Sequence, residues 1–180
     1  MPGVMKLEIF RVVLLITLLF VCFLTDVTRN KIYNFVVFPA MVLGILINGF
    51  FDGFSGIIQS LEGMLLGMAF LIIPYALRGI GAGDVKFLGA IGAIMGPGFT
   101  FNAFLFSAIA GGVISLAIML SDKNLRYKLK AVFLTFLSML GIIPKGLYLM
   151  ENLDSPVKKG RFPYGVAITF GTLLAFLLPL

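Results

Sequence analysis

Two aspartates, Asp26 and Asp84, are the residues of this sequence whose setting is most suggestive of chemistry. Asp26 ends an apolar block, and Asp84 follows a glycine-rich segment at 79–83. An acidic residue beside or within an apolar block is energetically costly and calls for a functional reason. Two carboxylates held close together cannot both ionise cheaply, so one can act as general base on a water while the other, still protonated, donates to a carbonyl. The pair is therefore our candidate for peptide hydrolysis.

Each aspartate also has a plain structural explanation when it is taken alone. A carboxylate just outside an apolar helix is often a solvated boundary residue or a helix cap. Chemistry therefore requires that the chain bring the two carboxylates together, which depends on the elements that carry them.

The composition indicates that these elements are membrane helices. The 180 residues are 60% hydrophobic and 12% charged, with a mean hydropathy of +1.10. A soluble domain of this size cannot bury so much apolar surface. We predict an all-α, polytopic helical bundle that forms a single membrane domain over residues 1–180. It has about six spans, at 9–25, 34–51, 57–77, 85–98, 101–120 and 163–180.

In this scheme, residues 121–162 form a cytoplasmic loop that contains an interfacial helix. An apolar stretch at 131–150 is interrupted by Gly141, Pro144, Lys145 and Gly146. A span with these residues near its centre would be polar and broken, so we assign the stretch to the membrane surface. If it crossed the membrane instead, the bundle would gain one more span.

The Lys and Arg residues indicate which side of the membrane the aspartates face. In this scheme, all of the 14 Lys and Arg residues except Lys6 and Arg11 lie in the loops after the first, third and fifth spans. Loops rich in Lys and Arg are cytoplasmic. Asp26 closes the first predicted span and Asp84 opens the fourth, so two complete crossings return the chain to the same side. Both carboxylates are therefore expected at the cytoplasmic boundary.

The composition gives little support to other classes of site. The chain contains no histidine and a single cysteine, Cys22, so we expect no zinc site, no disulfide framework and no cofactor. No basic stripe is interleaved with exposed aromatic residues, which argues against a nucleic-acid partner. We interpret the basic loop first as the positive-inside signal, and it could also bind a charged substrate leader or anionic membrane lipid.

Three segments resemble the motifs of the bacterial type IV prepilin peptidases, which are aspartyl proteases with a Gly-x-Gly-Asp motif. Gly-Ala-Gly-Asp-Val-Lys at 81–86 is similar to their second catalytic motif, and Asp-Val-Thr-Arg-Asn-Lys-Ile-Tyr-Asn at 26–34 is similar to the first. Phe-Pro-Tyr-Gly-Val-Ala at 162–167 resembles the start of the family's last span. The motifs occur in the family's order, and the resemblance covers almost the whole chain.

The resemblance implies a prepilin leader peptidase, an aspartic endopeptidase in which Asp26 and Asp84 are the catalytic dyad. The supporting motif residues are then Gly81, Gly83, Lys86 and Arg29. The implied substrate is a prepilin or pseudopilin, from which a short basic leader is cleaved just ahead of the substrate's hydrophobic helix. Cleavage would take place at the cytoplasmic face of the bacterial inner membrane.

The resemblance also predicts a reduced form of the enzyme. Larger family members carry a cytoplasmic domain with cysteine pairs after the first span, and they also methylate the new N-terminus. Here seven residues, 27–33, separate Asp26 from the second predicted span, and those cysteines are missing. We therefore expect a minimal, peptidase-only form, similar to those that serve tight-adherence or Flp-type pili.

A small ion- or proton-coupled transporter or channel component is the alternative, because the same aspartates could bind a proton or cation near broken helices. Against it, no inverted repeat is visible, and the acids are expected at one face rather than at the midplane. A presenilin-like intramembrane protease shares the Gly-x-Gly-Asp motif, but its first aspartate should follow a tyrosine within a span. Here Thr25 precedes Asp26 in what we interpret as a loop-like context.

Overall fold

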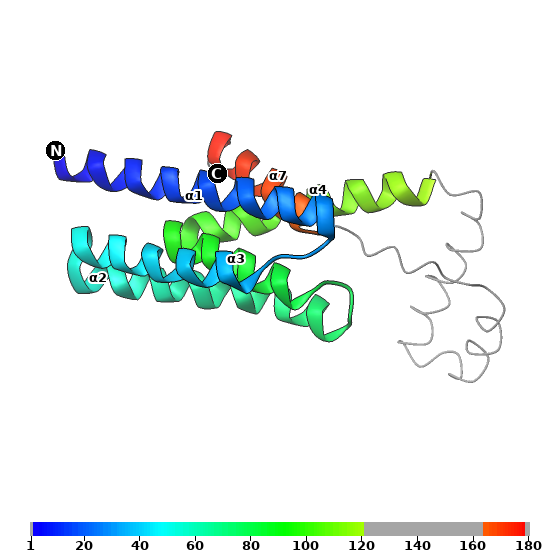
Figure 1. The fold of residues 1–180 in the computed structure, drawn as a ribbon, viewed down its shortest axis with the longest axis horizontal. Helices are drawn as coiled ribbons and strands as arrows, with labels where there is room; N and C mark the ends of the chain where they lie inside the picture. Colours follow the sequence, from blue (N-terminus) through cyan, green and yellow to red (C-terminus); the bar gives the residue numbers. More distant parts are fainter. Residues whose placement is uncertain (1, 121–163, 179–180) are drawn as a thin grey trace. The chain divides into compact units, whose positions relative to one another are not determined.

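The computed structural model describes residues 2–120 and 164–178, and every regular element in these residues is an α-helix (Figure 1). The elements are α1 (Pro2–Arg29), α2 (Asn34–Ala76), α3 (Ala82–Met95), α4 (Pro97–Leu120) and α7 (Tyr164–Leu177). The prediction of an all-α protein is confirmed. The predicted loop 121–162, with its interfacial helix at 131–150, lies outside the described residues.

The chain divides into two compact units, Met1–Gly112 with Phe162–Leu180, and Val113–Arg161. Both aspartates and the helices that surround them belong to the first unit, which includes α4 as far as Gly112. That the whole chain forms a single membrane domain stays a prediction.

Within residues 2–120 and 164–178, three helices are long and apolar enough to cross a membrane, namely Met5–Arg29, Asn34–Ala76 and Pro97–Ala117, and α7 is a shorter apolar helix. The chain is thus a membrane protein with several apolar helices. The blocks predicted at 9–25, 34–51, 57–77 and 101–120 fall almost entirely within the three long helices. Those at 85–98 and 163–180 correspond to α3 and α7. The number of six spans stays a prediction.

Helix α2 is 43 residues long and doubles back on itself at Gly53. Gly53 has φ 65° and ψ −144°, a backbone conformation that glycine adopts without the steric cost of a side chain. The two arms on either side of this break lie next to each other (Figure 1). Asn48 Nδ2 in the first arm donates a hydrogen bond to Ser60 Oγ in the second at 2.6 Å. The two arms correspond to the second and third predicted blocks.

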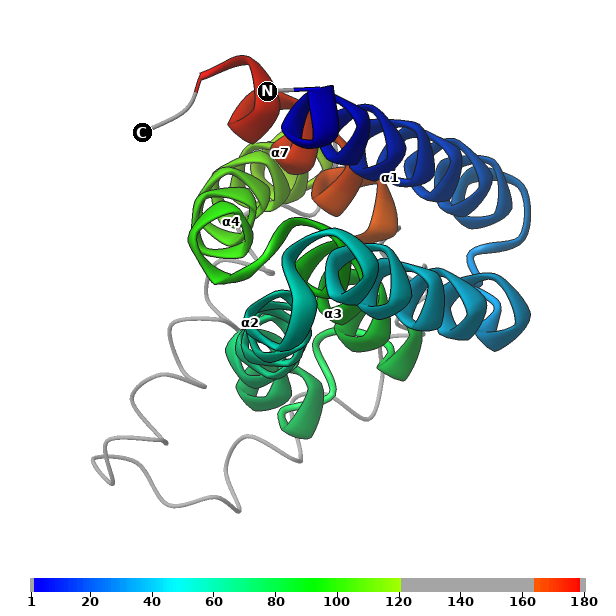
Figure 2. The same ribbon diagram turned by 90° about the vertical axis from the view of Figure 1, so that its left-hand side faces the viewer.

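Helix α3 lies among the other helices (Figure 2), and every residue from 87 to 94 is buried. Its 14 residues span only about 21 Å, less than the roughly 30 Å of a hydrocarbon core. A helix this short and this buried packs against protein rather than lipid. This is one of the two ways in which a short fourth block can be accommodated in a membrane bundle.

Small residues let the backbones of α2 and α3 touch. Gly63 and Gly92 face each other so closely that a Cβ on either would meet the other's carbonyl group. A Cβ on Gly67 would lie 2.6 Å from the Leu88 carbonyl oxygen. Close backbone contact of this kind is how membrane helices gain packing energy where the hydrophobic effect is weak. It holds α3, and with it Asp84, against α2.

Two helix boundaries differ from those predicted, and both concern the aspartates. Helix α1 continues beyond Asp26, which therefore lies in the last turns of a helix and not in a loop. The helix ends only at Asn30, whose φ is 50° and whose N–H donates to the Asp26 carbonyl at 2.8 Å. Helix α3 begins before Asp84, because Gly81 acts as its N-cap. Asp84 is thus part of the first helical turn.

Candidate active site

Asp26 is buried, with 4% of its surface exposed, and its carboxylate lies at the start of α7. Its Oδ2 accepts a hydrogen bond from the Val166 backbone N–H at 3.1 Å. A Cβ on Gly165 would lie 2.7 Å from the same oxygen, so only glycine lets the α7 backbone come this close. The backbone N–H and the positive end of the helix dipole offset part of the cost of burying this carboxylate. The first turn of α7 thus binds the Asp26 carboxylate.

Asp84 is also buried, with 9% of its surface exposed, and it lies in the first turn of α3. Its Oδ2 accepts a hydrogen bond from the Gly81 N–H at 3.0 Å, while its own N–H donates to the Gly81 carbonyl at 3.1 Å. The Asp84 side chain thus supplies one half of a capping box, and the other bond goes to the backbone carbonyl because glycine has no side chain. This arrangement fixes the direction of the Asp84 carboxylate.

Ile32, in the connection between α1 and α2, packs against the backbone beside both aspartates. A Cβ on Gly83, the residue before Asp84, would lie 3.0 Å from Ile32 Cβ. A Cβ on Gly165, which touches Asp26, would lie 3.0 Å from Ile32 Cδ1. Asp26 and Asp84 therefore lie at the same end of the bundle, near one aliphatic side chain.

A further observation places the helices that carry the aspartates side by side. Helices α1, α3 and α7 also contact one another in pairs. The sequence-based expectation that the two aspartates meet is consistent with this geometry, whereas their catalytic roles stay a prediction.

The two basic residues of the predicted motifs bind neighbours at the start of α2. Lys86 Nζ donates to Asn34 Oδ1 at 3.0 Å and lies 5.0 Å from the centre of the Phe38 ring. Arg29 Nη1 donates to the Tyr33 hydroxyl at 3.1 Å on the exposed surface. Among the predicted supporting residues, Gly81 and Gly83 thus shape the Asp84 turn, and Lys86 and Arg29 hold the chain between α1 and α2.

The backbone of residues 165 and 166 and the side chain of Ile32 are the parts of the site that sequence reasoning did not identify. Both fall inside segments that resemble family motifs, so the sequence marked these segments but did not indicate what these residues do. Backbone donors and an aliphatic spacer have no characteristic residue type, and only the geometry reveals them. No group of three or more His, Cys, Asp and Glu that could hold a metal occurs within residues 2–120 and 164–178. The expected absence of a cofactor stays a prediction.

The fold and the site define a membrane protein with two buried aspartates at one end of a helical bundle. Residues 13–116 match the type IV leader peptidase family. The match covers more than half of the chain and both aspartates, and the chain belongs to this family.

A prepilin leader peptidase/N-methyltransferase of Bacillus subtilis (strain 168) is 28% identical over 122 residues, which are 66% of this chain and 48% of that protein. The chain therefore spans about half the length of this curated relative. No solved structure matches the chain.

Proposed function

We propose that this protein is a membrane aspartyl endopeptidase that removes a short basic leader from prepilin-like substrates. The observation that supports the proposal is that Asp26 and Asp84, from separate helices, are both buried near Ile32, in a chain of the type IV leader peptidase family. The family match also favours hydrolysis over ion transport. The substrate class comes from the family resemblance and from the name of the relative.

In the proposed mechanism the two carboxylates share one proton. The ionised carboxylate removes a proton from a water molecule, whose oxygen attacks the carbonyl carbon of the scissile peptide. The protonated carboxyl gives its proton to the carbonyl oxygen, which yields a tetrahedral intermediate. When this intermediate collapses, the C–N bond breaks and the leaving nitrogen takes up a proton from the dyad. No group besides water and the dyad is consumed.

We place the reaction at the cytoplasmic boundary of the bacterial inner membrane. Arg29, Lys31, Arg78 and Lys86 all lie at or near the end of the bundle that carries the aspartates. Concentration of basic residues at one membrane face is the mark of the cytoplasmic side. The orientation of the six-span scheme, with both termini outside, follows from the same bias.

We further propose that the protein cleaves without methylating, as a minimal form like those of tight-adherence or Flp-type systems. Only residues 30–33 connect α1 to α2, which leaves no room there for an inserted domain. The relative's name includes N-methyltransferase, so methyl transfer is the second activity to be tested. Processed substrate incubated with labelled S-adenosylmethionine should carry no label at its new N-terminus. Label transferred by the purified protein would contradict the peptidase-only form.

The test of the dyad is a processing assay with a prepilin substrate and purified full-length protein. Asp26→Asn and Asp84→Asn, made separately, should each lower the cleavage rate by about 100-fold or more. Glu62→Gln is the matched control, since Glu62 is an exposed acid in the second arm of α2. If either dyad variant cleaves at close to the wild-type rate, the proposed mechanism is wrong.

A further inference from the structure

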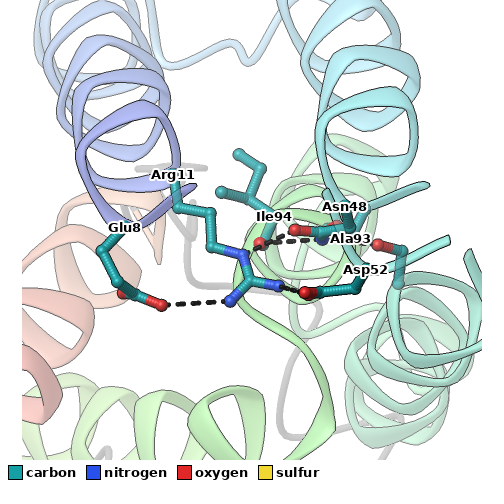
Figure 3. Close-up of polar contacts among 7 residues, drawn as sticks. Glu8, Arg11, Asn48, Asp52, Ala93 and Ile94 are labelled. Carbon is teal, nitrogen blue, oxygen red and sulfur yellow. Dashed lines mark hydrogen bonds and ion pairs between the residues drawn. The ribbon is translucent and has the colours of Figure 1, made fainter. Parts of the chain in front are cut away.

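The end of the bundle away from the aspartates contains a second polar cluster, shown in Figure 3. Arg11 Nε of α1 donates to Asn48 Oδ1 of α2 at 2.5 Å. Asn48 Nδ2 in turn donates to Ser60 Oγ in the second arm of α2 at 2.6 Å. We call Arg11, Asn48 and Ser60 the polar clamp. At its edge, the Arg11 guanidinium forms ion pairs with Glu8 and Asp52.

Asn48 also connects the clamp to α3. Its Nδ2 lies 3.1 Å from the Ala93 carbonyl oxygen and 3.2 Å from that of Ile94, near the end of α3. Asn48 is 1% exposed, and the Arg11 side chain is 15% exposed. One buried amide therefore binds three elements: α1 through its oxygen, and both α3 and the second arm of α2 through its nitrogen.

Between the clamp and Asp26 the α1 interface is apolar, and contacts of that kind do not strongly fix how far one helix slides along another. The buried side chains of α1 between the two ends are Leu15, Leu18, Leu19 and Cys22. In a membrane, such packing lacks the hydrophobic driving force that it has in water. Hydrogen bonds, by contrast, require one position and one direction.

We propose that the polar clamp is a positioning device that sets the register of α1 against α3 and so aligns Asp26 with Asp84. Helix α3 is already held on α2 by direct backbone contact at Gly63 and Gly92. Residues 4–29 of α1 contain no glycine that would allow such contact, and α1 is tied to α3 at this end through Asn48. A helix is stiff, so a shift at Arg11 is transmitted over the roughly 22 Å to Asp26. The catalytic consequence rests on the proposed function.

The first test measures geometry and does not depend on activity. Spin labels are placed at the exposed positions Leu24 on α1 and Ile73 on α2, as cysteines in a Cys22→Ala background, in protein reconstituted in lipid nanodiscs. Asn48→Leu should shift or broaden the distance distribution between the labels. Glu8→Gln, which leaves the Arg11 to Asn48 bond in place, should not. An unchanged distribution in folded Asn48→Leu protein would overturn the proposal.

The second test measures cleavage kinetics. Arg11→Met and Asn48→Leu should each lower kcat by about tenfold or more, because misplacement of reacting groups by about 1 Å can cost up to 100-fold. KM should stay within a factor of about two, since the clamp is remote from the site at which substrate is cleaved. Arg11→Lys, which keeps a donor at this position, should recover part of kcat. The double variant should be no slower than Asn48→Leu, because the two residues act through one bond.

The outcomes separate the clamp from the proposed activity. If Asn48→Leu does not fold, Arg11→Met carries the same prediction from a less buried position. If the wild-type protein has no measurable peptidase activity and the label distance still shifts in Asn48→Leu, the result would support the clamp and contradict the proposed function. A kcat that falls while the label distance stays unchanged would overturn the positioning role.

Discussion

The two ends of the bundle hold their carboxylates in different ways. Backbone N–H groups at the starts of α7 and α3 bind Asp26 and Asp84, which are buried. A guanidinium binds Glu8 and Asp52, whose side chains are 53% and 41% exposed. An exposed ion pair contributes little to stability. A buried carboxylate is costly and is therefore retained for a reason. The contrast supports assigning chemistry to the first end and alignment to the second.

The comparison is tested most severely at Gly165, which touches the Asp26 carboxylate. Gly165→Ala places a Cβ 2.7 Å from Asp26 Oδ2, and the carboxylate is the group that can move. We expect the cleavage rate to fall about 100-fold, by misplacement of a reacting group, while thermal stability changes little. Gly98→Ala is the control, since a Cβ there has nothing within 4 Å. A Gly165→Ala enzyme of normal activity would mean that the position of Asp26 is not critical.

A substitution at the α2–α3 contact, between the two ends of the bundle, should lower the stability of the protein more than its activity. A Cβ on Gly92 meets the backbone of Gly63, so two helices must separate to accept it. Gly92→Ala should destabilise the protein by about 1–3 kcal/mol, as overpacked positions do, measured by thermal unfolding in detergent. Gly112→Ala should not destabilise it, because that position faces open space. Equal melting temperatures for the two variants would contradict the close α2–α3 contact.

Lys86 lies near the aspartate end but contacts α2. Lys86→Met keeps an unbranched side chain of similar length and loses the hydrogen bond to Asn34. We expect a fall in the cleavage rate of less than about tenfold, smaller than the 10² to 10⁴ that general acid–base groups provide. A loss as large as that of Asp84→Asn would show that Lys86 takes part in the chemistry, which would revise the contrast between the ends.

The smallest effect is expected at the edge of the clamp. Glu8→Gln removes an exposed ion pair with Arg11 and leaves the bond from Arg11 to Asn48 in place. The loss should be about 0.2–1 kcal/mol and should decrease with added salt. Chemical denaturation at low and high ionic strength measures it. A larger, salt-independent loss would place Glu8 inside the clamp.

Much of the fold was predictable because apolar helices leave a strong pattern in the sequence. Block positions and the reversal between 51 and 57 follow from hydropathy and from the glycine there. The boundaries next to the aspartates did not follow, because polar residues such as Asp26 and Thr28 end an apolar block without ending a helix. The Thr28 hydroxyl donates a hydrogen bond to the Leu24 carbonyl, and the residue stays helical.

The candidate site was predictable in its acids and not in their surroundings. Asp26 and Asp84 are acids placed directly beside apolar blocks, and that position, together with the motifs around them, singles them out among the eight acidic residues. The donors of Val166 and Gly81 are backbone groups, which every residue except proline possesses. The clamp was missed for a related reason, since Asn48 is uncharged and a single amide inside an apolar block gives little signal.

The most direct test of the central claim compares the cleavage rates of Asp26→Asn, Asp84→Asn and the double variant in purified, folded protein. If the two carboxylates act as one unit, each single variant loses nearly all activity and the double variant is no slower than either. A single variant that retains most of its activity, or single losses that multiply in the double variant, would contradict a shared-proton dyad.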